Sequence, residues 1–363
     1  MKVLQICAYA ARYGGNFLAS LKALEAALEQ QGVKTAYLFP ETARDMPWCR
    51  ELCSRAQVYF AGLNRFSPKV YRQIKAVMAD ADVIHSHFEL YDCLTAMAKK
   101  KHQKLFWHLH DSFEEVIDLP HRIINKFQYG WLGKKATLIS PNDHYSSMVA
   151  AWGFPGGRII HVDNAVEFSR LHRENKEIEY DFLVFGGFYR IKGLDVLMDA
   201  CRILRDKGVD FRLGVVGYPD TWRFLEDNYP ELKGNIRKLE PSEDVSGFYN
   251  AAGAYICASR RECFSYAVLE ALYMGKTSIV SRIPGNQWAV GYPSVTAFPT
   301  EDAVALAAAM ERQLTEPCSA ADRLASAEDV EKRYCARKWA QTIKEIYFGD
   351  EITAGNHGVH TDL

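Results

Sequence analysis

The chain has 363 residues, of which 48% are hydrophobic and 25% charged, a balance typical of a soluble globular protein. Single cores rarely grow beyond about 250–300 residues, so this length predicts two domains. No stretch approaches the roughly 20 apolar residues of a membrane-spanning helix, and the apolar start favours a buried strand over a signal peptide. The nine cysteines form no paired Cys-x-x-Cys motifs, which argues against a zinc ribbon or disulfide framework and favours reduced thiols.

The net charge of −1 conceals an asymmetry between the two halves of the chain. Residues 1–165 contain 20 Lys and Arg against 15 Asp and Glu, whereas residues 166–363 contain 24 against 30. A basic first half could meet an anionic partner or a membrane surface, and solvated charge runs such as 99–101 explain it equally well. No nucleic-acid partner is expected.

Strand-like apolar runs alternate with helical patterns from the start of the chain, which predicts βαβ units and parallel sheets. The strands expected in the first half are 3–8, 35–39, 82–88, 104–110, 136–140 and 159–162. Between the first two, apolar residues at helical spacing predict a helix over 16–32 that stops at Gly32.

The second half repeats this alternation after a polar, charged segment at 166–179, which we interpret as the linker. Its expected strands and helices are 180–187, 193–208, 211–217, 253–259, 276–281 and a last helix over 327–348. These elements predict an N-terminal domain over 1–168, completed by the C-terminal helix 332–348, and a C-terminal domain over 180–331.

Two acids lie in one mostly apolar stretch at 260–275. Glu262 and Glu270 are separated by seven residues and follow an expected strand, and Ser265 is expected to cap the helix that holds Glu270. A helix N-terminus favours anions such as phosphate, while carboxylates accept hydrogen bonds from hydroxyl groups. The pattern therefore favours an extended ligand with phosphates and sugar hydroxyls over two solvent-facing glutamates.

This stretch resembles the family-4 glycosyltransferases, retaining enzymes whose motif pairs two glutamates at the same spacing. The resemblance implies an α/β fold of the GT-B architecture, with two doubly wound Rossmann-like domains facing across a cleft. It implies that Glu262 is catalytic and contacts the donor sugar, and that Glu270 contacts the nucleotide ribose. The backbone around Cys263, Phe264 and Ser265 would meet the diphosphate, although Cys263 and Ser265 replace the family's usual glycines.

The loop over 185–193 extends the resemblance to the start of the second half. Lys192 is expected to neutralise the diphosphate, because departure of a nucleoside diphosphate builds negative charge on its oxygens. The family usually has an arginine where Gly187 stands, and we expect Arg190 to substitute for it. If Lys192 and Arg190 were only solvated charges, their place at a helix start would be unfavourable without a bound anion.

A Gly-Gly turn, Gly14-Gly15, follows the first expected strand. The resemblance implies that this turn lets the backbone approach the donor phosphate or the acceptor, so both glycines are candidate substrate-binding residues. The turn lacks the third glycine of a dinucleotide fingerprint, which argues against a dehydrogenase.

Four histidines end two of the expected strands, His85 with His87 and His108 with His110. Alternate residues of a strand share a face, so a metal site is conceivable, but no clear third ligand accompanies either pair. The sequence is also interpreted as holding no metal-binding Asp-x-Asp motif, so we expect neither a metal nor a cofactor. The resemblance makes His110 a catalytic residue beside the reacting sugar carbon, while His85 and His87 stay open between an acceptor-side role and simple packing.

The sequence thus predicts a cytoplasmic, metal-independent, retaining hexosyltransferase with a nucleotide diphosphate sugar donor, UDP-sugar favoured, and a hydroxyl acceptor. The resemblance implies bacterial polysaccharide or glycoconjugate assembly. Two alternatives remain open, a nucleotide-sugar epimerase of the same architecture and a non-catalytic GT-B sugar-binding partner. Gly187 favours the latter, as does Trp288, which stands where the family has an acid and is predicted to stack on a sugar or base.

The acceptor is expected to be a carbohydrate or a lipid-linked carbohydrate. Two segments that mix basic and aromatic residues, 65–79 and 119–135, are candidates for peripheral contact with the inner face of a membrane. Ordinary amphipathic packing explains both segments equally well.

Overall fold

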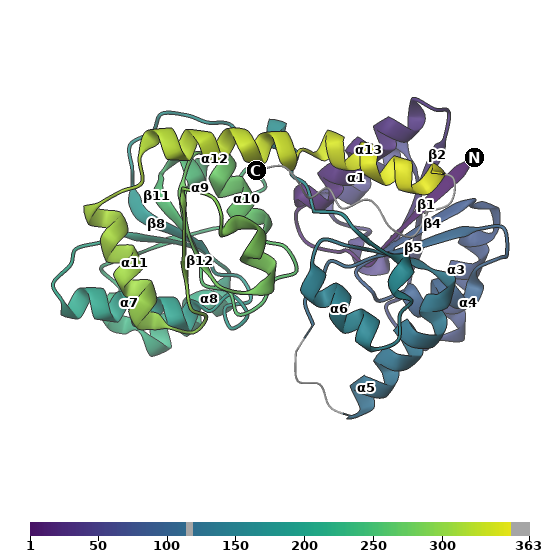
Figure 1. The fold of residues 1–363 in the computed structure, drawn as a ribbon, viewed down its shortest axis with the longest axis horizontal. Coiled ribbons are helices and arrows are strands. Elements are labelled where there is room, and N and C mark those ends of the chain that lie inside the picture. Colours follow the sequence, from purple (N-terminus) through teal and green to yellow (C-terminus); the bar gives the residue numbers. More distant parts are fainter. Residues whose placement is uncertain (114–118, 350–363) are drawn as a thin grey trace. The chain divides into compact units, whose positions relative to one another are not determined.

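The computed structural model describes residues 1–113 and 119–349, and the chain divides into two compact units (Figure 1). The first unit comprises Met1–Arg12, Leu21–Val162 and the residues from Arg337 onward. The second comprises Tyr13–Ser20 and Asp163–Ala336, so the expected linker at 166–179 lies inside it. No helix among the described residues is long and apolar enough to cross a bilayer.

The first unit is built on a seven-stranded parallel sheet with the order β3-β2-β1-β4-β5-β6-β7. Its strands are β1 Lys2–Cys7, β2 Lys34–Pro40, β3 Gln57–Ala61, β4 Val83–His87, β5 Lys104–His108, β6 Thr137–Ser140 and β7 Ile159–His161. Sequence analysis missed β3, an edge strand whose residues are mostly half-buried and so lack a clear apolar run. The strand order reverses between β1 and β4, where doubly wound sheets commonly bind ligands at the carboxyl ends of their strands.

Helices connect these parallel strands. They are α1 Gly15–Glu29, α2 Pro47–Arg55, α3 Pro68–Val77, α4 Asp92–Ala98, α5 Leu119–Asn125 and α6 Asp143–Ala151, together with the π-helix η3 Lys126–Leu132 and the short 3-10 turn η4 Gly133–Lys135. Helix α1 ends three residues before Gly32, whose positive φ of 71° turns the chain into β2 as the sequence predicted.

The second unit contains a six-stranded parallel sheet with the order β10-β9-β8-β11-β12-β13. Its strands are β8 Tyr180–Phe185, β9 Leu213–Val216, β10 Ile236–Leu239, β11 Ala252–Cys257, β12 Thr277–Ser281 and β13 Val295–Phe298. The two sheets confirm the predicted α/β class, two Rossmann-like domains. The strands β10 and β13 were missed, because both are short and edge-placed.

Helices cover both faces of this second sheet. They are α7 Leu194–Asp206, α8 Pro219–Asn228, α9 Ser246–Asn250, α10 Tyr266–Tyr273, α11 Ala303–Thr315 and α12 Ala320–Arg333. Apolar residues of α7 and α11 pack in one core cluster, and those of α10 and α12 pack in another. The central strands β9, β8, β11 and β12 are therefore largely buried on both sides, whereas the edge strands β10 and β13 are only partly buried.

The last predicted helix, 327–348, is in fact two helices, α12 and α13 Ala336–Phe348. The helix is interrupted where the backbone of Val166 pairs with the segment between α12 and α13. Val166 N donates to Tyr334 O at 2.8 Å, and Val166 O accepts from Ala336 N at 3.0 Å. The apolar spacing alone could not reveal this long-range pairing. The break coincides with the boundary between the units at Ala336.

Candidate active site

An ion pair joins the two loops that flank the switch point of the second sheet. Lys192 lies in the loop after β8 and Glu262 in the loop after β11, and Lys192 Nζ donates to Glu262 Oε1 at 2.5 Å. Ser259 Oγ donates to the same carboxylate oxygen at 2.8 Å. The two predicted site residues therefore meet at the carboxyl ends of β8 and β11, where sheets of this order bind ligands.

Lys192 remains a full cation in this setting. Burial alone would lower its pKa, but the charge and hydrogen bond of Glu262 outweigh burial and raise that pKa. The side chains are 32% and 16% exposed, so the pair is partly desolvated. A partly desolvated cation at a strand end can exchange its carboxylate partner for a phosphate oxygen.

Two glycines let these loops lie against their neighbours. A side chain at Gly193, where φ is +62°, would place its Cβ 2.1 Å from Ala258 O. A side chain at Gly285 would place its Cβ 2.2 Å from Glu262 O. Substitution at either position would displace Lys192 or Glu262 through the backbone. Sequence analysis did not single out Gly285, since one glycine in a turn carries no distinctive signal.

Arg190, the expected substitute for the missing arginine, is exposed, and its guanidinium lies 6.0 Å from the ring centroid of Tyr189. Among the described contacts, none holds this side chain against Lys192 or Glu262. The neighbouring Arg260 has a clear structural role, with a two-pronged ion pair to Asp195 at 2.8 Å. This pair ties the β11 loop to the start of α7.

The residues between the two glutamates are buried. Cys263, Phe264 and Ser265 are each less than 5% exposed, and the ring of Phe264 stacks on Trp288 at 4.9 Å. Ser265 occupies the N-cap position of α10, but its side chain makes no capping hydrogen bond, so that expectation was wrong. Its hydroxyl lies 3.8 Å from Cys257 Sγ instead. Because one face of Trp288 packs on Phe264, the Trp288 ring helps to hold the loop that follows Glu262.

Glu270 is the centre of a buried hydrogen-bond network. Asn16 Nδ2 donates to its Oε1 at 2.6 Å, and the Tyr249 hydroxyl donates to its Oε2 at 2.9 Å. Arg170 Nη1 in turn donates to Asn16 Oδ1 at 3.0 Å. Burial raises the pKa of Glu270, while the hydrogen bonds from Tyr249 and Asn16 oppose the rise. The network fixes the carboxylate, and each oxygen keeps a second lone pair for a hydroxyl donor.

The Gly-Gly turn is adjacent to this network. Gly14 is buried, Gly15 begins α1 with φ at +57°, and Asn16 follows directly. The residues Tyr13–Ser20 belong to the second unit, so the turn and Glu270 lie in the same unit. Sequence analysis missed Asn16, because a single asparagine after two glycines is the composition of an ordinary turn.

In the first unit, a chain of hydrogen bonds links the predicted His110 to four other side chains. His110 Nε2 lies 3.0 Å from His87 Nδ1, and His87 Nε2 lies 2.9 Å from Gln5 Oε1. Gln5 Nε2 donates to the Tyr347 hydroxyl at 3.1 Å, and that hydroxyl lies 2.5 Å from His85 Nδ1. We call these five residues the histidine chain. Its strand members lie on β1, β4 and just beyond β5.

The donor and acceptor of the first two hydrogen bonds in this chain can be assigned. Because Gln5 Oε1 can only accept, His87 donates through Nε2, and its Nδ1 then accepts from His110. Burial, reinforced by neighbouring imidazoles, lowers the pKa of His85, His87 and His110 well below the ordinary range. His110 is therefore a neutral, oriented hydrogen-bonding group. His85 and His87, left open by the sequence, are buried members of its support.

His108 extends the cluster, with its Nδ1 3.2 Å from His85 Nε2. Nitrogen atoms of His85, His87 and His108 all lie within 4.8 Å of one another, a spacing that could hold a metal ion. Nitrogens of these same residues also make the hydrogen bonds described above.

Two acids near this histidine chain were missed in the sequence. Glu89 follows β4 in a left-handed conformation (φ 47°), and its Oε1 accepts from His110 N at 3.1 Å. Burial, followed by the charges of Asp111 and Asp92, raises the pKa of Glu89 well above its ordinary value. Burial also raises the pKa of Asp92 to about 7. The position after an expected strand was the available signal for Glu89.

Asp80-Ala81-Asp82 has the spacing of a metal-binding Asp-x-Asp motif, so the interpretation that the sequence holds no such motif was wrong. The structure places it before the amino end of β4, at the opposite edge of the sheet from His110. The Lys2 ammonium pairs with Asp80 at 2.9 Å, and Lys2 N donates to Asp82 Oδ2 at 2.8 Å. The motif therefore serves as a structural clasp on β1.

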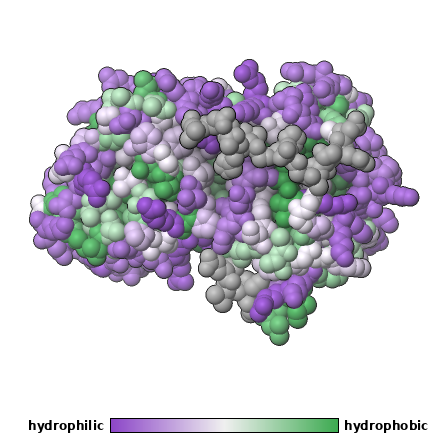
Figure 2. All heavy atoms as spheres, viewed as in Figure 1, coloured by the Kyte–Doolittle hydropathy of each residue, from purple (hydrophilic) through white to green (hydrophobic). Residues whose placement is uncertain are grey.

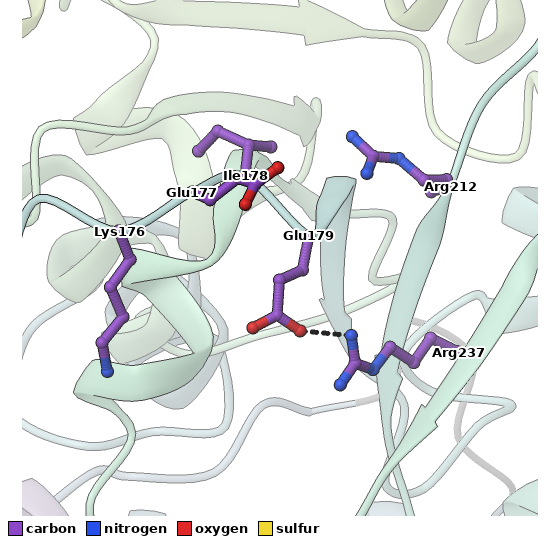
Figure 3. Close-up of a pocket in the computed structure, with 6 residues that line it drawn as sticks. All are labelled: Lys176, Glu177, Ile178, Glu179, Arg212 and Arg237. Carbon is purple, nitrogen blue, oxygen red and sulfur yellow. Dashed lines mark hydrogen bonds and ion pairs between the residues drawn. The ribbon is translucent and has the colours of Figure 1, made fainter.

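A surface pocket in the second unit also lies at the amino edge of its sheet (Figure 3). Its lining residues precede or begin β8, β9 and β10, and they are Lys176, Glu177, Ile178, Glu179, Arg212 and Arg237. Glu179 and Arg237 form an ion pair across it, and Arg212 pairs with Asp181 at 3.1 Å. Because it lies opposite the carboxyl ends of the strands, this pocket is separate from the candidate site.

Two parallel doubly wound sheets, each with a reversal of strand order, are the two Rossmann-like domains of the GT-B architecture. Two family models match the chain, Glycosyltransferase Family 4 over residues 20–170 and Glycosyl transferases group 1 over residues 179–316. Together they cover most of the sequence. The chain therefore belongs to the family-4 glycosyltransferases of GT-B architecture, as its motifs predicted.

Solved structures support the same fold over nearly the whole chain. Sucrose-phosphate synthase from Thermosynechococcus elongatus matches with a TM-score of 0.80 at 18% identity, covering 96% of this chain and 98% of that one. Anabaena HepE in complex with UDP and glucose matches with a TM-score of 0.80 at 15% identity, covering 96% and 100%. WaaG, a glycosyltransferase involved in lipopolysaccharide biosynthesis, matches with a TM-score of 0.69 at 15% identity, covering 96% and 100%. Among curated proteins, none matches the chain significantly.

Proposed function

We propose that this glycosyltransferase transfers a hexosyl group from a UDP-sugar to a hydroxyl acceptor with retention of anomeric configuration. The observation that carries the proposal is the Lys192–Glu262 pair at the switch point, inside the segment that matches Glycosyl transferases group 1. UDP is favoured as the nucleotide because the structurally similar HepE binds UDP and glucose. Glu270, with two donors already fixing it, supplies the acceptor lone pairs for the ribose hydroxyls.

In the proposed reaction, the bond between the anomeric carbon and the diphosphate oxygen breaks while the acceptor oxygen bonds to that carbon on the same face. The acceptor proton passes to the departing diphosphate. Lys192 leaves Glu262 to neutralise the diphosphate, assisted by Arg190 and by the amides around Cys263, Phe264 and Ser265. Glu262, released, accepts hydrogen bonds from donor-sugar hydroxyls, so no metal ion is needed for charge neutralisation.

His110 acts in this proposal as a neutral hydrogen-bonding group for the donor sugar, since its low pKa excludes a standing positive charge. Gly14 and Gly15, which directly precede Asn16, are proposed to let the backbone approach the ribose beside Glu270. The cellular setting is cytoplasmic assembly of a bacterial polysaccharide or glycoconjugate, at the inner face of the membrane. The similarity to WaaG supports that setting.

Thermal shift against UDP-, GDP- and ADP-sugars tests the donor, because a ligand that binds only the folded state raises the unfolding temperature. Turnover of the stabilising donor is then compared for Lys192→Ala, Glu262→Ala and the matched control Lys207→Ala, whose ion pair with Glu311 is on the surface. Loss of Lys192 is expected to reduce kcat/KM about 100- to 1,000-fold, with Lys207→Ala unchanged. Turnover untouched by both site changes would refute the proposal, and release of a free epimer without acceptor would favour an epimerase.

A further inference from the structure

A short segment of the first unit carries an unusual concentration of exposed apolar side chains. Five large apolar residues between 119 and 131 are 38–68% exposed: Leu119, Ile123, Ile124, Phe127 and Trp131. They lie on α5 and η3, and Figure 2 shows apolar and polar atoms side by side over α5. Single exposed apolar residues are ordinary, but a contiguous group marks an interaction surface.

The opposite face of this segment is already packed against the first unit. Tyr129 and Leu132 are buried, and the Tyr129 ring contacts Trp107 and Trp152 at 6.1 and 5.4 Å between centroids. Gln128 Oε1 accepts from Cys93 Sγ at 3.2 Å. The exposed face is thus presented by an anchored element, with the rings of Phe127 and Trp131 5.1 Å apart on it.

The charge of the segment is entirely positive. Residues 119–135 contain no Asp or Glu and four cations, Arg122, Lys126, Lys134 and Lys135, all exposed. The cationic character extends beyond the segment, since Lys99 has its pKa lowered by burial and by the charges of Arg158 and Lys135. Apolar and aromatic residues between cations match the boundary between headgroups and acyl chains of an anionic bilayer.

The other segment that the sequence offered for membrane contact is different. In 65–79, the apolar residues Val70, Ile74 and Met78 are all less than 5% exposed, because α3 and the turn after it pack them into the first unit. Phe66, which precedes α3, is 81% exposed, but it is a single large apolar side chain and not a contiguous group. Amphipathic packing explains that segment. It does not explain 119–135, where packing uses one face and leaves the other apolar face uncovered.

We propose that the exposed face of residues 119–135 docks on the surface of an anionic phospholipid bilayer. Leu119, Ile123, Phe127 and Trp131 insert at the headgroup boundary, and Arg122 and Lys126 contact lipid phosphates. The inference rests on the proposed function in one respect: docking brings the enzyme to an acceptor that is itself carried on a lipid.

Vesicle sedimentation tests this docking with the full chain at low and high salt. The vesicles are phosphatidylcholine alone and phosphatidylcholine mixed with phosphatidylglycerol. The wild type is expected to bind the mixed vesicles at low salt and far less at high salt. Phe127→Glu, Trp131→Glu and the double change Arg122→Glu with Lys126→Glu are each expected to weaken binding at least about tenfold.

Matched controls are Leu324→Glu and Lys332→Glu, an exposed leucine and lysine on α12, which should bind like the wild type. Thermal shift with UDP-sugar, run without vesicles, should be unchanged in every variant. Failure of the wild type to bind mixed vesicles would overturn the docking proposal, even if UDP-sugar stabilises the protein. Equal losses of vesicle binding in the α12 controls would overturn it as well. So would the finding that the wild type binds no vesicles and instead forms a concentration-dependent dimer that Phe127→Glu abolishes. Vesicle binding without any donor stabilisation would instead count against the proposed function.

Discussion

The candidate edges of the two units handle charge in opposite ways. In the second unit, Lys192 and Glu262 are held as a close ion pair. In the first unit, burial favours the neutral forms of the groups around His110, because it lowers the histidine pKa values and raises the carboxyl pKa values of Glu89 and Asp92. The difference teaches that a sheet edge can hold a charge ready for an anion when a cation has an exchangeable carboxylate partner. A sheet edge whose side chains are buried and only hydrogen-bonded to one another is more stable when those side chains are uncharged.

The largest expected effect is on the free energy of unfolding and comes from the Asp92 carboxyl of the first unit. Asp92 has its pKa raised to about 7 by burial, so stability is full when both folded and unfolded states hold the proton. It falls as pH rises from about 4 to 7, because the unfolded state releases the proton first, and the full shift corresponds to about 4 kcal/mol. Asp92→Asn should therefore leave stability nearly unchanged at pH near 4 and raise it by up to about 4 kcal/mol at pH near 8.

Chemical denaturation at the two pH values measures this difference directly. The exposed Asp220 supplies the control, since Asp220→Asn should leave the unfolding midpoint unchanged at both pH values. An Asp92→Asn effect of equal size at both values would show that the pKa of Asp92 is the same in the folded and unfolded states.

A smaller effect is expected in the second unit, on the affinity for UDP, when Glu270 loses a hydrogen bond. Asn16→Ala removes one of the two hydrogen bonds to Glu270, and charge-assisted hydrogen bonds are typically worth about 1.5–3 kcal/mol. The pKa of Glu270 should rise further, so the carboxylate accepts less well from ribose hydroxyls. We expect UDP affinity by titration calorimetry to fall about tenfold. Asn228→Ala, on the exposed end of α8, should bind normally, and unchanged affinity in Asn16→Ala would place Glu270 outside the nucleotide site.

The smallest effects are expected from removing two buried tyrosine hydroxyls, one in each unit. Tyr347→Phe removes the hydroxyl between Gln5 and His85, and Tyr249→Phe removes a donor to Glu270. Each change should cost about 1 kcal/mol or slightly more in unfolding free energy, because buried polar groups lose a partner. Only Tyr249→Phe should also weaken UDP binding. If Tyr347→Phe weakened UDP binding equally, the two edges would not be independent in function.

Much of this architecture was predictable because its signals are local. The strand and helix alternation fixed the class, and the spacing of Glu262 and Glu270 after a strand located the edge that holds Lys192. The missed features depend on contacts far apart in sequence. Val166 divides the last helix at Tyr334, and Asn16 reaches Glu270 across 254 positions. No periodicity within a segment records such partners.

The neutral state of the histidine chain was equally out of reach. A His-x-His pair indicates a shared strand face, but the pKa of His87 depends first on burial and then on the imidazoles of His85, His110 and His108, of which the last two belong to β5 or follow it. The burial of Ser265 also shows why its capping role failed: its hydroxyl faces Cys257 in the core, although the residue occupies the expected position.

The short segment Tyr13–Ser20 has a consequence for how such enzymes can recombine. It belongs to the second unit although nearly the whole first unit separates it from Asp163, and it supplies Asn16 to Glu270 and the Tyr13 hydroxyl to Pro241 O at 2.9 Å. A chimera that inherits everything after Val162 from a relative would thus combine a new Glu270 environment with the old Asn16. Exchange of the whole second unit between relatives therefore requires crossovers before Tyr13, after Ser20, after Val162 and after Ala336, and the one after Ser20 lies inside α1.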